Sequence, residues 1–182
     1  MKKEIKKIFK VLKYYLCYSS FQKMFLDSKT KQEGKIILFD KEFYYHYGLA
    51  FYDTYKEVFE NNIYEFKTNS PKPIIIDCGA NMGLSVLYFS KKHPKAEIIA
   101  FEPDEAVLPF LEKNIQVQEI KNVKLYKKAV WTEETELQFY TDNGLGGRVG
   151  KEYDNQTPKL IKSLRLRDFL DKHCSIDMLK IL

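Results

Sequence analysis

The sequence has few cysteines and no long apolar run, and both absences narrow the classes of protein to consider. Its three cysteines, Cys17, Cys78 and Cys174, are too few and too scattered for a disulfide framework or a zinc site. The three histidines show no metal-ligand spacing. No stretch approaches the roughly 18–20 apolar residues that span a bilayer, and the N-terminus lacks the features of a signal peptide. We therefore expect a cytoplasmic protein without a metal site.

The chain has no net positive charge beyond the first 35 residues. Those residues hold ten lysines and three acidic residues, whereas the rest of the chain is slightly acidic. The net charge of +5 therefore belongs to one end, and a nucleic-acid partner is not indicated. Residues 3–26 have an amphipathic helical pattern with lysines between the apolar positions. We expect this segment either to pack on the core or to contact a membrane surface peripherally.

A short polar stretch divides the chain into two regions. Ser70-Pro71-Lys72-Pro73 is a composition typical of a boundary. We expect residues 1–70 to form a basic amphipathic arm and a helical cap, with a strand at 36–39 and a helix at 52–64. Residues 71–182 are expected to form the core domain.

The core region alternates between strand-like and helix-like patterns. Ile74-Ile75-Ile76 is a short apolar run of the kind found in strands buried on both faces of a parallel sheet. Further strands are expected at 97–101, 123–126, 136–140 and 178–182, helices at 84–92 and 105–116, and either a strand or a helix at 164–170. This alternation predicts an α/β sandwich with a mostly parallel sheet.

The loop after the first buried strand is the most informative segment. The chain reads IIIDCGANMG from Ile74 to Gly83, and a helix is expected to follow directly. Glycine at positions 79 and 83 permits a sharp turn and close approach of a ligand. Such loops lie at the carboxyl ends of strands, where α/β sheets bind ligands, and the helix N-terminus favours an electron-rich group. We expect Gly79 and Gly83 to contact a ligand and Asn81 to bond either the ligand or the loop.

The spacing of the glycines argues against a dinucleotide. The G-x-G-x-x-G fingerprint, begun at Gly79, would require glycine where the chain has Asn81 and Leu84. Asp77 would repel a pyrophosphate, but it suits a ligand ammonium, directly or through water; alternatively it only orders the loop. A ligand with an amino acid end and a nucleoside end fits better, and S-adenosylmethionine has both.

An acidic residue at the end of the next expected strand supports this ligand. Glu102 follows the strand at 97–101 and lies 19 residues after Gly83. It is placed to accept two hydrogen bonds from a ribose diol. A strand-end glutamate considered alone is more often a solvated carboxylate. The glycine loop at the right separation makes the ribose role the better interpretation.

The remaining candidate contacts surround the expected adenine position. Pro103 and Asp104 would flank the adenine, although Asp104 serves equally well as a helix N-cap. Lys128 and Ala129 follow the third strand, where an adenine edge would meet the backbone; the alternative is a surface lysine beside a core alanine. Cys78 is expected to be a small buried apolar residue and not a nucleophile.

The same residues carry a family resemblance. The loop at 74–83, the segment FEPDEAVLPFLEKN at 101–114 and KKAVW at 127–131 resemble the FkbM family of methyltransferases. FYDTYKEVFENNIY at 51–64 and RLRDFLDKHCSIDMLKIL at 165–182 look like that family's pre-core helix and the lead into its fourth core strand. The resemblance implies a Rossmann-like class I methyltransferase fold, S-adenosylmethionine as cofactor, and O-methylation of a sugar, glycan or secondary-metabolite hydroxyl on a small-molecule or glycan acceptor.

The sequence departs from the family at its end. Leu182 stands where the family has an acidic residue followed by a turn, so the chain is expected to be truncated relative to the family. An exposed strand at 178–182 would then favour self-association. Two alternatives to an active O-methyltransferase stay open: a non-catalytic cofactor-binding fragment, and another nucleotide-binding α/β protein. The catalytic base is not identified.

Overall fold

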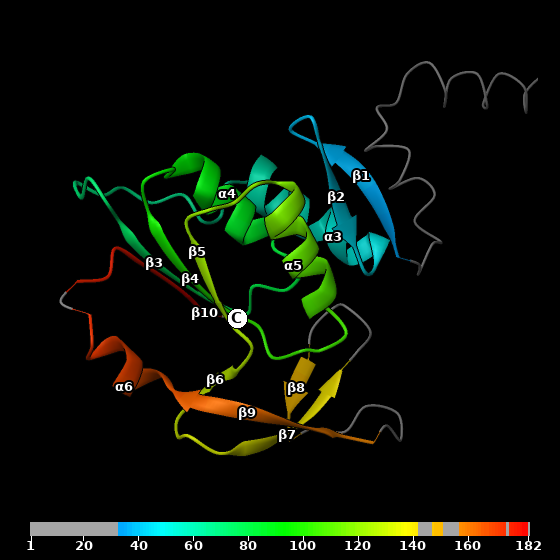
Figure 1. The fold of residues 1–182 in the computed structure, drawn as a ribbon, viewed down its shortest axis with the longest axis vertical. Helices are drawn as coiled ribbons and strands as arrows, with labels where there is room; N and C mark the ends of the chain where they lie inside the picture. The colour runs from blue at the N-terminus through cyan, green and yellow to red at the C-terminus, as the bar shows by residue number, and fades with distance from the viewer. Residues whose placement is uncertain (1–32, 142–146, 151–156, 174, 182) are drawn as a thin grey trace, which may run out of the picture.

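The structure is a computed structural model that describes residues 33–141, 147–150, 157–173 and 175–181 (Figure 1). The expected helix at 3–26 and the strand end at Leu182 lie outside these residues. Within the described part of the chain, none of the helices has both the length and the apolar character needed to cross a membrane.

The core is a four-stranded parallel sheet. Its strands are β3 (Ile74–Cys78), β4 (Glu97–Phe101), β5 (Val123–Tyr126) and β10 (Met178–Ile181), in the order β10-β3-β4-β5. The chain builds outward from β3 to β4 and β5, and it returns to the opposite side of β3 with β10. In α/β sheets this reversal of strand order marks the place where ligands bind. The predicted Rossmann-like α/β fold is confirmed.

Alternating side chains of β3 pack against different layers. Ile75 packs with Tyr88 and Phe89 of helix α4 (Leu84–Lys92), whereas Ile76 packs near Phe169 of the short helix α6 (Leu166–Leu170). Successive strand residues point to opposite faces, which is why a wholly apolar strand fits a sheet covered on both sides. Helix α5 (Leu108–Val117) lies on the α4 side (Figure 1).

The N-terminal region contains a hairpin as well as helices. Strands β1 (Gly34–Leu38) and β2 (Lys41–Tyr45) pair antiparallel, so the strand expected at 36–39 is present and has a partner that was not predicted. The two-residue turn has φ of 52° at Phe39 and 64° at Asp40. Positive φ at both positions belongs to the tight turns whose twist matches a hairpin, but phenylalanine rarely adopts it, which hides the turn from sequence reasoning.

The helix expected at 52–64 is present in altered form. It consists of α3 (Gly48–Tyr55) and a π-helical turn, η1 (Lys56–Glu60). The turn packs against α4, with Val58 fully buried beside Tyr88. The helical cap therefore begins four residues earlier and ends four residues sooner than the apolar pattern indicated.

A second, four-stranded sheet lies beyond the carboxyl ends of the parallel strands (Figure 1). It contains β6 (Ala129–Trp131), β7 (Glu136–Thr141), β8 (Gly147–Val149) and β9 (Lys159–Arg165), in the order β6-β9-β7-β8. Only β7 was predicted as a strand. The segment 164–170, which fitted a strand or a helix, contains both, because β9 ends at Arg165 and α6 begins at Leu166.

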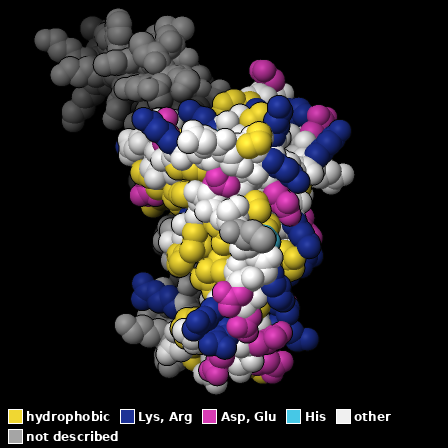
Figure 2. Space-filling view, turned by 90° about the vertical axis from the view of Figure 1, so that its left-hand side faces the viewer, with side chains coloured by type: hydrophobic (Ala, Val, Ile, Leu, Met, Phe, Trp, Pro, Cys, Tyr) yellow, Lys and Arg dark blue, Asp and Glu magenta, His cyan; other side chains and the backbone are white. Residues whose placement is uncertain are grey.

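Strand β10 is the outermost described strand of the parallel sheet. Its Leu179 and Ile181 side chains are 37% and 61% exposed. Figure 2 views the side that lies at the left of Figure 1, where hydrophobic side chains gather in the middle of the face and charged side chains of both signs lie below them. Self-association through β10 stays a prediction.

Two buried amides attach the hairpin to helix α5. Asn114 accepts a hydrogen bond from Tyr44 N at 2.7 Å and donates to Tyr44 O at 2.7 Å and to Met82 O at 2.8 Å. Gln118 Nε2 donates to carbonyls of the hairpin, including Glu42 O at 3.1 Å. Because Met82 belongs to the glycine loop, Asn114 connects the N-terminal hairpin to that loop.

We expect Asn114→Ala to lower the free energy of unfolding by about 2–4 kcal/mol, because three hydrogen bonds are lost and buried backbone groups are left without partners. Urea denaturation measures the change. The matched control is Gln116→Ala, an exposed position on the same helix, which should change stability by less than about 0.5 kcal/mol. Equal losses for the two variants would contradict the anchoring role.

Candidate functional site

A cavity of about 620 Å³ lies at the carboxyl ends of β3 and β4. This volume is in the range of small-ligand sites. Its lining includes six of the eight residues predicted to bind a cofactor: Gly79, Asn81, Glu102, Pro103, Lys128 and Ala129. The other two, Asp77 and Gly83, lie outside the lining.

The glycine loop folds over the end of β4. The amides of Gly79 and Ala80 both donate to Phe101 O at 2.9 Å. Gly79 has a φ of 89° and Asn81 a φ of 49°, so two of the loop residues adopt left-handed conformations. The Asn81 side chain accepts a hydrogen bond from Met82 N at 2.6 Å. Of its two predicted roles, bonding within the loop is therefore the one that the geometry shows.

Gly83 acts through its conformation. It is the N-cap of α4 with a φ of 97°, and a Cβ atom there would lie 2.8 Å from Leu111 Cδ1. Both the backbone angle and the packing of α5 therefore require glycine. Gly83 lies outside the cavity lining and shapes the loop, and its direct contact with a ligand stays a prediction.

Asp77 lies beneath the loop and is fully buried. Its Oδ2 accepts a hydrogen bond from Ser85 Oγ at 2.6 Å, and its Oδ1 lies 2.7 Å from Lys180 Nζ. Both carboxylate oxygens therefore have partners inside the protein. These bonds favour the alternative that Asp77 orders the loop, and its contact with a ligand ammonium stays a prediction.

Glu102 is a buried carboxylate in the cavity wall. Its Oε2 accepts a hydrogen bond from Asn81 N at 2.7 Å and its Oε1 one from Asp104 N at 2.9 Å. Burial raises the pKa of Glu102 to about 7, although these two amides act in the opposite direction. Each oxygen still has a second lone pair for a ligand donor. Glu102 therefore both holds the loop and presents acceptor atoms to the cavity.

Asp104 connects the site to the second sheet. Its Oδ1 accepts from Ala106 N at 2.9 Å and its Oδ2 from Thr141 Oγ1 of β7 at 2.7 Å. Its bond to Ala106 N lies in the turn at 105–107 that precedes the helix. Helix α5 begins at Leu108 with Val107 as its N-cap and without a side-chain capping bond, so the N-cap interpretation of Asp104 is wrong.

Lys128 and Ala129 show features of both of their interpretations. The Lys128 ammonium lies 3.5 Å from Glu134 at the surface, and Ala129 is buried with Leu137 and Phe139. Both nevertheless line the cavity. Cys78 also lines it, and burial raises the pKa of its thiol to about 12. The thiol is therefore protonated near neutral pH, as expected for an apolar residue and not a nucleophile.

The second sheet contributes an apolar wall that sequence reasoning missed. Trp131, Phe139 and Val149 line the cavity opposite the glycine loop. The Phe139 ring lies over Gly147, where a Cβ atom would be only 1.6 Å from Phe139 Cζ. The alternation of apolar and polar residues at 136–140 predicts a strand. It does not predict that this strand pairs with β8 and β9, and this pairing places Phe139 at the cavity.

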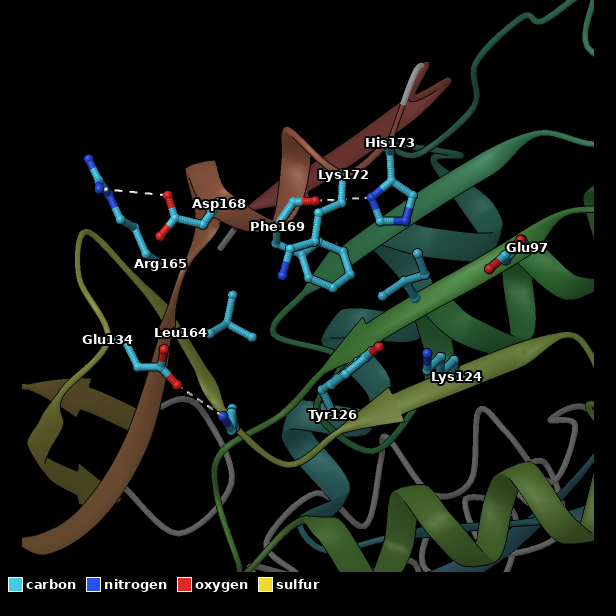
Figure 3. Close-up of a pocket in the computed structure, with 12 residues that line it drawn as sticks. Glu97, Lys124, Tyr126, Glu134, Leu164, Arg165, Asp168, Phe169, Lys172 and His173 are labelled. Atoms are coloured by element: carbon cyan, nitrogen blue, oxygen red, sulfur yellow. Dashed lines mark hydrogen bonds and ion pairs between the residues drawn. The ribbon is translucent and has the colours of Figure 1, made fainter.

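A second cavity of about 450 Å³ lies on the α6 side of the sheet (Figure 3). Tyr126 and Phe169 form its aromatic part, with ring centroids 5.6 Å apart. Several of its charged groups pair with one another: Lys128 with Glu134 at 3.5 Å, and Arg165 with Asp168 at 3.6 Å. The glycine loop and Glu102 are absent from its lining, so the cavity at the strand ends is the better candidate site.

Comparison with known proteins finds similar methyltransferases. No family model matches the chain. The methyltransferase sdnD of Sordaria araneosa is 38% identical over 65 residues, which are 36% of this chain and 25% of that protein. The 2-O-methyltransferase NoeI of Sinorhizobium fredii is 30% identical over 84 residues, covering 46% and 33%. The chain is similar to methyltransferases. The similarity to methyltransferases that the sequence predicted is confirmed.

The chain spans a third or less of the length of these curated relatives. Among solved structures, the methyltransferase FkbM of Methylobacillus flagellatus KT has a TM-score of 0.40 and 17% identity, covering 60% of this chain and 25% of that one.

The raised pKa of Glu102 predicts a pH-dependent stability. Its folded-state pKa of about 7 exceeds the ordinary 4.5, so the folded protein holds this proton more tightly than the unfolded chain. The stabilisation is complete below about pH 4.5 and is lost as the pH rises through 7. Between pH 5 and pH 8 we expect a loss of about 2–3 kcal/mol that Glu102→Gln does not show. Urea denaturation at both pH values measures it; parallel pH profiles for the two proteins would contradict it.

Proposed function

We propose that the chain is the cofactor-binding part of an S-adenosylmethionine-dependent methyltransferase. The observation that carries this proposal is the position of Glu102, a buried carboxylate that lies beside the Gly79 loop in a cavity at the carboxyl ends of β3 and β4. The similarity to curated methyltransferases supports it.

The groups around the cavity fit S-adenosylmethionine. The loop offers backbone close to the ligand at Gly79, where no side chain intervenes. Glu102 offers acceptor lone pairs that suit a ribose diol. Phe101, Val107 and Ala129 supply apolar surface of the kind that an adenine ring requires. Acceptor, amide and apolar groups thus occur in one cavity, each matching a different part of the cofactor.

In this proposal the chain's residues bind and orient. When bound, S-adenosylmethionine supplies an already activated methyl group, so the protein mainly aligns the reaction partners and excludes water. Glu102 holds the ribose, and the Gly79 loop holds the amino acid end. The apolar wall of Trp131, Phe139 and Val149 excludes water from the opposite side of the cavity.

We propose that the methyl acceptor is a hydroxyl of a sugar, glycan or secondary metabolite. The printed name of the relative NoeI, a 2-O-methyltransferase, supports oxygen as the acceptor atom. Trp131 is 40% exposed and lines the cavity, so it offers an aromatic face to an acceptor. A hydroxyl acceptor benefits from a general base. Methyl transfer to a sugar hydroxyl, followed with radiolabelled cofactor, tests this specificity; binding without transfer would favour the non-catalytic alternative.

Calorimetry tests cofactor binding directly. We expect the chain to bind S-adenosylmethionine and not NAD. Glu102→Gln should weaken this binding about tenfold, because one charged acceptor is lost while most of the side chain's shape is kept. The matched control is Glu105→Gln, three residues along and exposed, which should bind as the unaltered chain does. Tighter binding of NAD, or equal binding by the Glu102 variant, would overturn the proposal.

The same site should bind its ligand more tightly at higher pH. A ribose hydroxyl donates to the ionised form of Glu102, and the pKa of that group is about 7. Affinity should therefore rise as the pH increases from 6 to 8. Titrations across this range in one buffer of constant ionic strength measure the rise, and Glu102→Gln should flatten it. A flat profile for the unaltered chain would show that Glu102 does not meet the ligand as a carboxylate.

A further inference from the structure

A buried ion pair connects strand β10 to strand β3. Lys180 Nζ lies 2.7 Å from Asp77 Oδ1, and the two side chains are 3% and 0% exposed. Isolated charges at such depth are unfavourable unless they are paired and hydrogen-bonded. Ser85 completes the set by donating to the second oxygen of Asp77 at 2.6 Å. The pair is thus a satisfied polar cluster inside an otherwise apolar layer.

Lys180 also reaches the glycine loop. Its ammonium donates to Gly79 O at 2.7 Å, while Gly79 N donates to Phe101 O at 2.9 Å. The residue that begins the loop is therefore held from two sides, its amide by β4 and its carbonyl by β10. Lys180 is itself absent from the cavity lining, so it acts on the site through Gly79 and Asp77 and through its charge, which lowers the pKa of Glu102.

We infer that Lys180 is a positioning residue, which fixes the Gly79 loop in its ligand-binding shape by holding the Gly79 carbonyl from strand β10. The inference takes the identity of the ligand, S-adenosylmethionine, from the proposed function, whereas the contact of Lys180 with the loop is independent of it. Lys180 is 103 residues from Asp77 in sequence, so the loop that binds cofactor depends on a strand contributed from far along the chain.

Two roles of Lys180 can be separated by substitution. One role is to neutralise Asp77, and the other is to hold the Gly79 carbonyl. Lys180→Met keeps the aliphatic stem but leaves Asp77 with a buried, unpaired charge, which should destabilise the whole fold. The double variant Asp77→Asn with Lys180→Met removes both charges. It should recover much of the stability, but the hydrogen bond to Gly79 O remains absent.

The experiment compares the unaltered chain, Lys180→Met and the double variant. Three properties are measured: the unfolding temperature, the hydrogen exchange of peptides spanning residues 79–83 without ligand, and the calorimetric Kd for S-adenosylmethionine. We expect the double variant to unfold near the temperature of the unaltered chain, with loop amides exchanging about tenfold faster and S-adenosylmethionine binding about tenfold weaker. Lys162→Met, at an exposed position on β9, is the matched control and should change none of the three.

The outcomes distinguish this inference from the proposed function. A double variant with slow loop exchange and undiminished binding would overturn the positioning role, because Lys180 would then only neutralise Asp77. If Lys180→Met does not fold, hydrogen exchange and S-adenosylmethionine binding of the double variant alone test the positioning role. If the unaltered chain binds no S-adenosylmethionine, the proposed function fails, and loop exchange without ligand still supports or overturns the role of Lys180.

Discussion

The parallel register of β3 and β4 is the constraint on which the candidate site depends. Cys78 pairs with Phe101 at the ends of the two strands, so the next residue on each strand, Gly79 and Glu102, leaves the sheet at the same level. Phe101 O then receives two loop amides, which bends the chain over β4 and toward Glu102. A one-residue shift of register would place Glu102 on the other face of the sheet and separate it from the loop.

The glycine loop is shaped by side chains from three other elements more than by its own sequence. Glu102 beyond β4 accepts from Asn81 N, Asn114 of α5 donates to Met82 O, and Lys180 of β10 donates to Gly79 O. A left-handed conformation at Asn81 is uncommon for a residue other than glycine and persists only where the surroundings determine it. These three contacts hold the loop residues in this conformation.

Sequence reasoning identified the local part of this arrangement. The apolar run at Ile74, the loop glycines and the position of Glu102 follow from periodicity and spacing over about thirty residues, and Gly79 and Glu102 both line the cavity at the strand ends. The partner of Asp77 could not be found in this way, since an aspartate before a glycine loop is compatible with a ligand or with a lysine 103 residues away. The apolar wall at Phe139 was missed for the same reason, because strand pairing across the second sheet has no local signature.

The burial of Glu102 lowers the stability of the fold but places a hydrogen-bond acceptor where a ligand can bind. A carboxylate that is almost fully buried, with a pKa of about 7, is unfavourable for folding near neutral pH, and an apolar residue of similar size would remove that cost. Its two backbone partners reduce the cost without removing it, since burial is still the dominant influence on its pKa. A charged group kept where packing disfavours it points to a ligand that compensates it. In this cavity, ligand hydroxyls would compensate the charge by donating hydrogen bonds to the ionised Glu102. Glu102 therefore destabilises the protein without ligand and stabilises the complex with ligand.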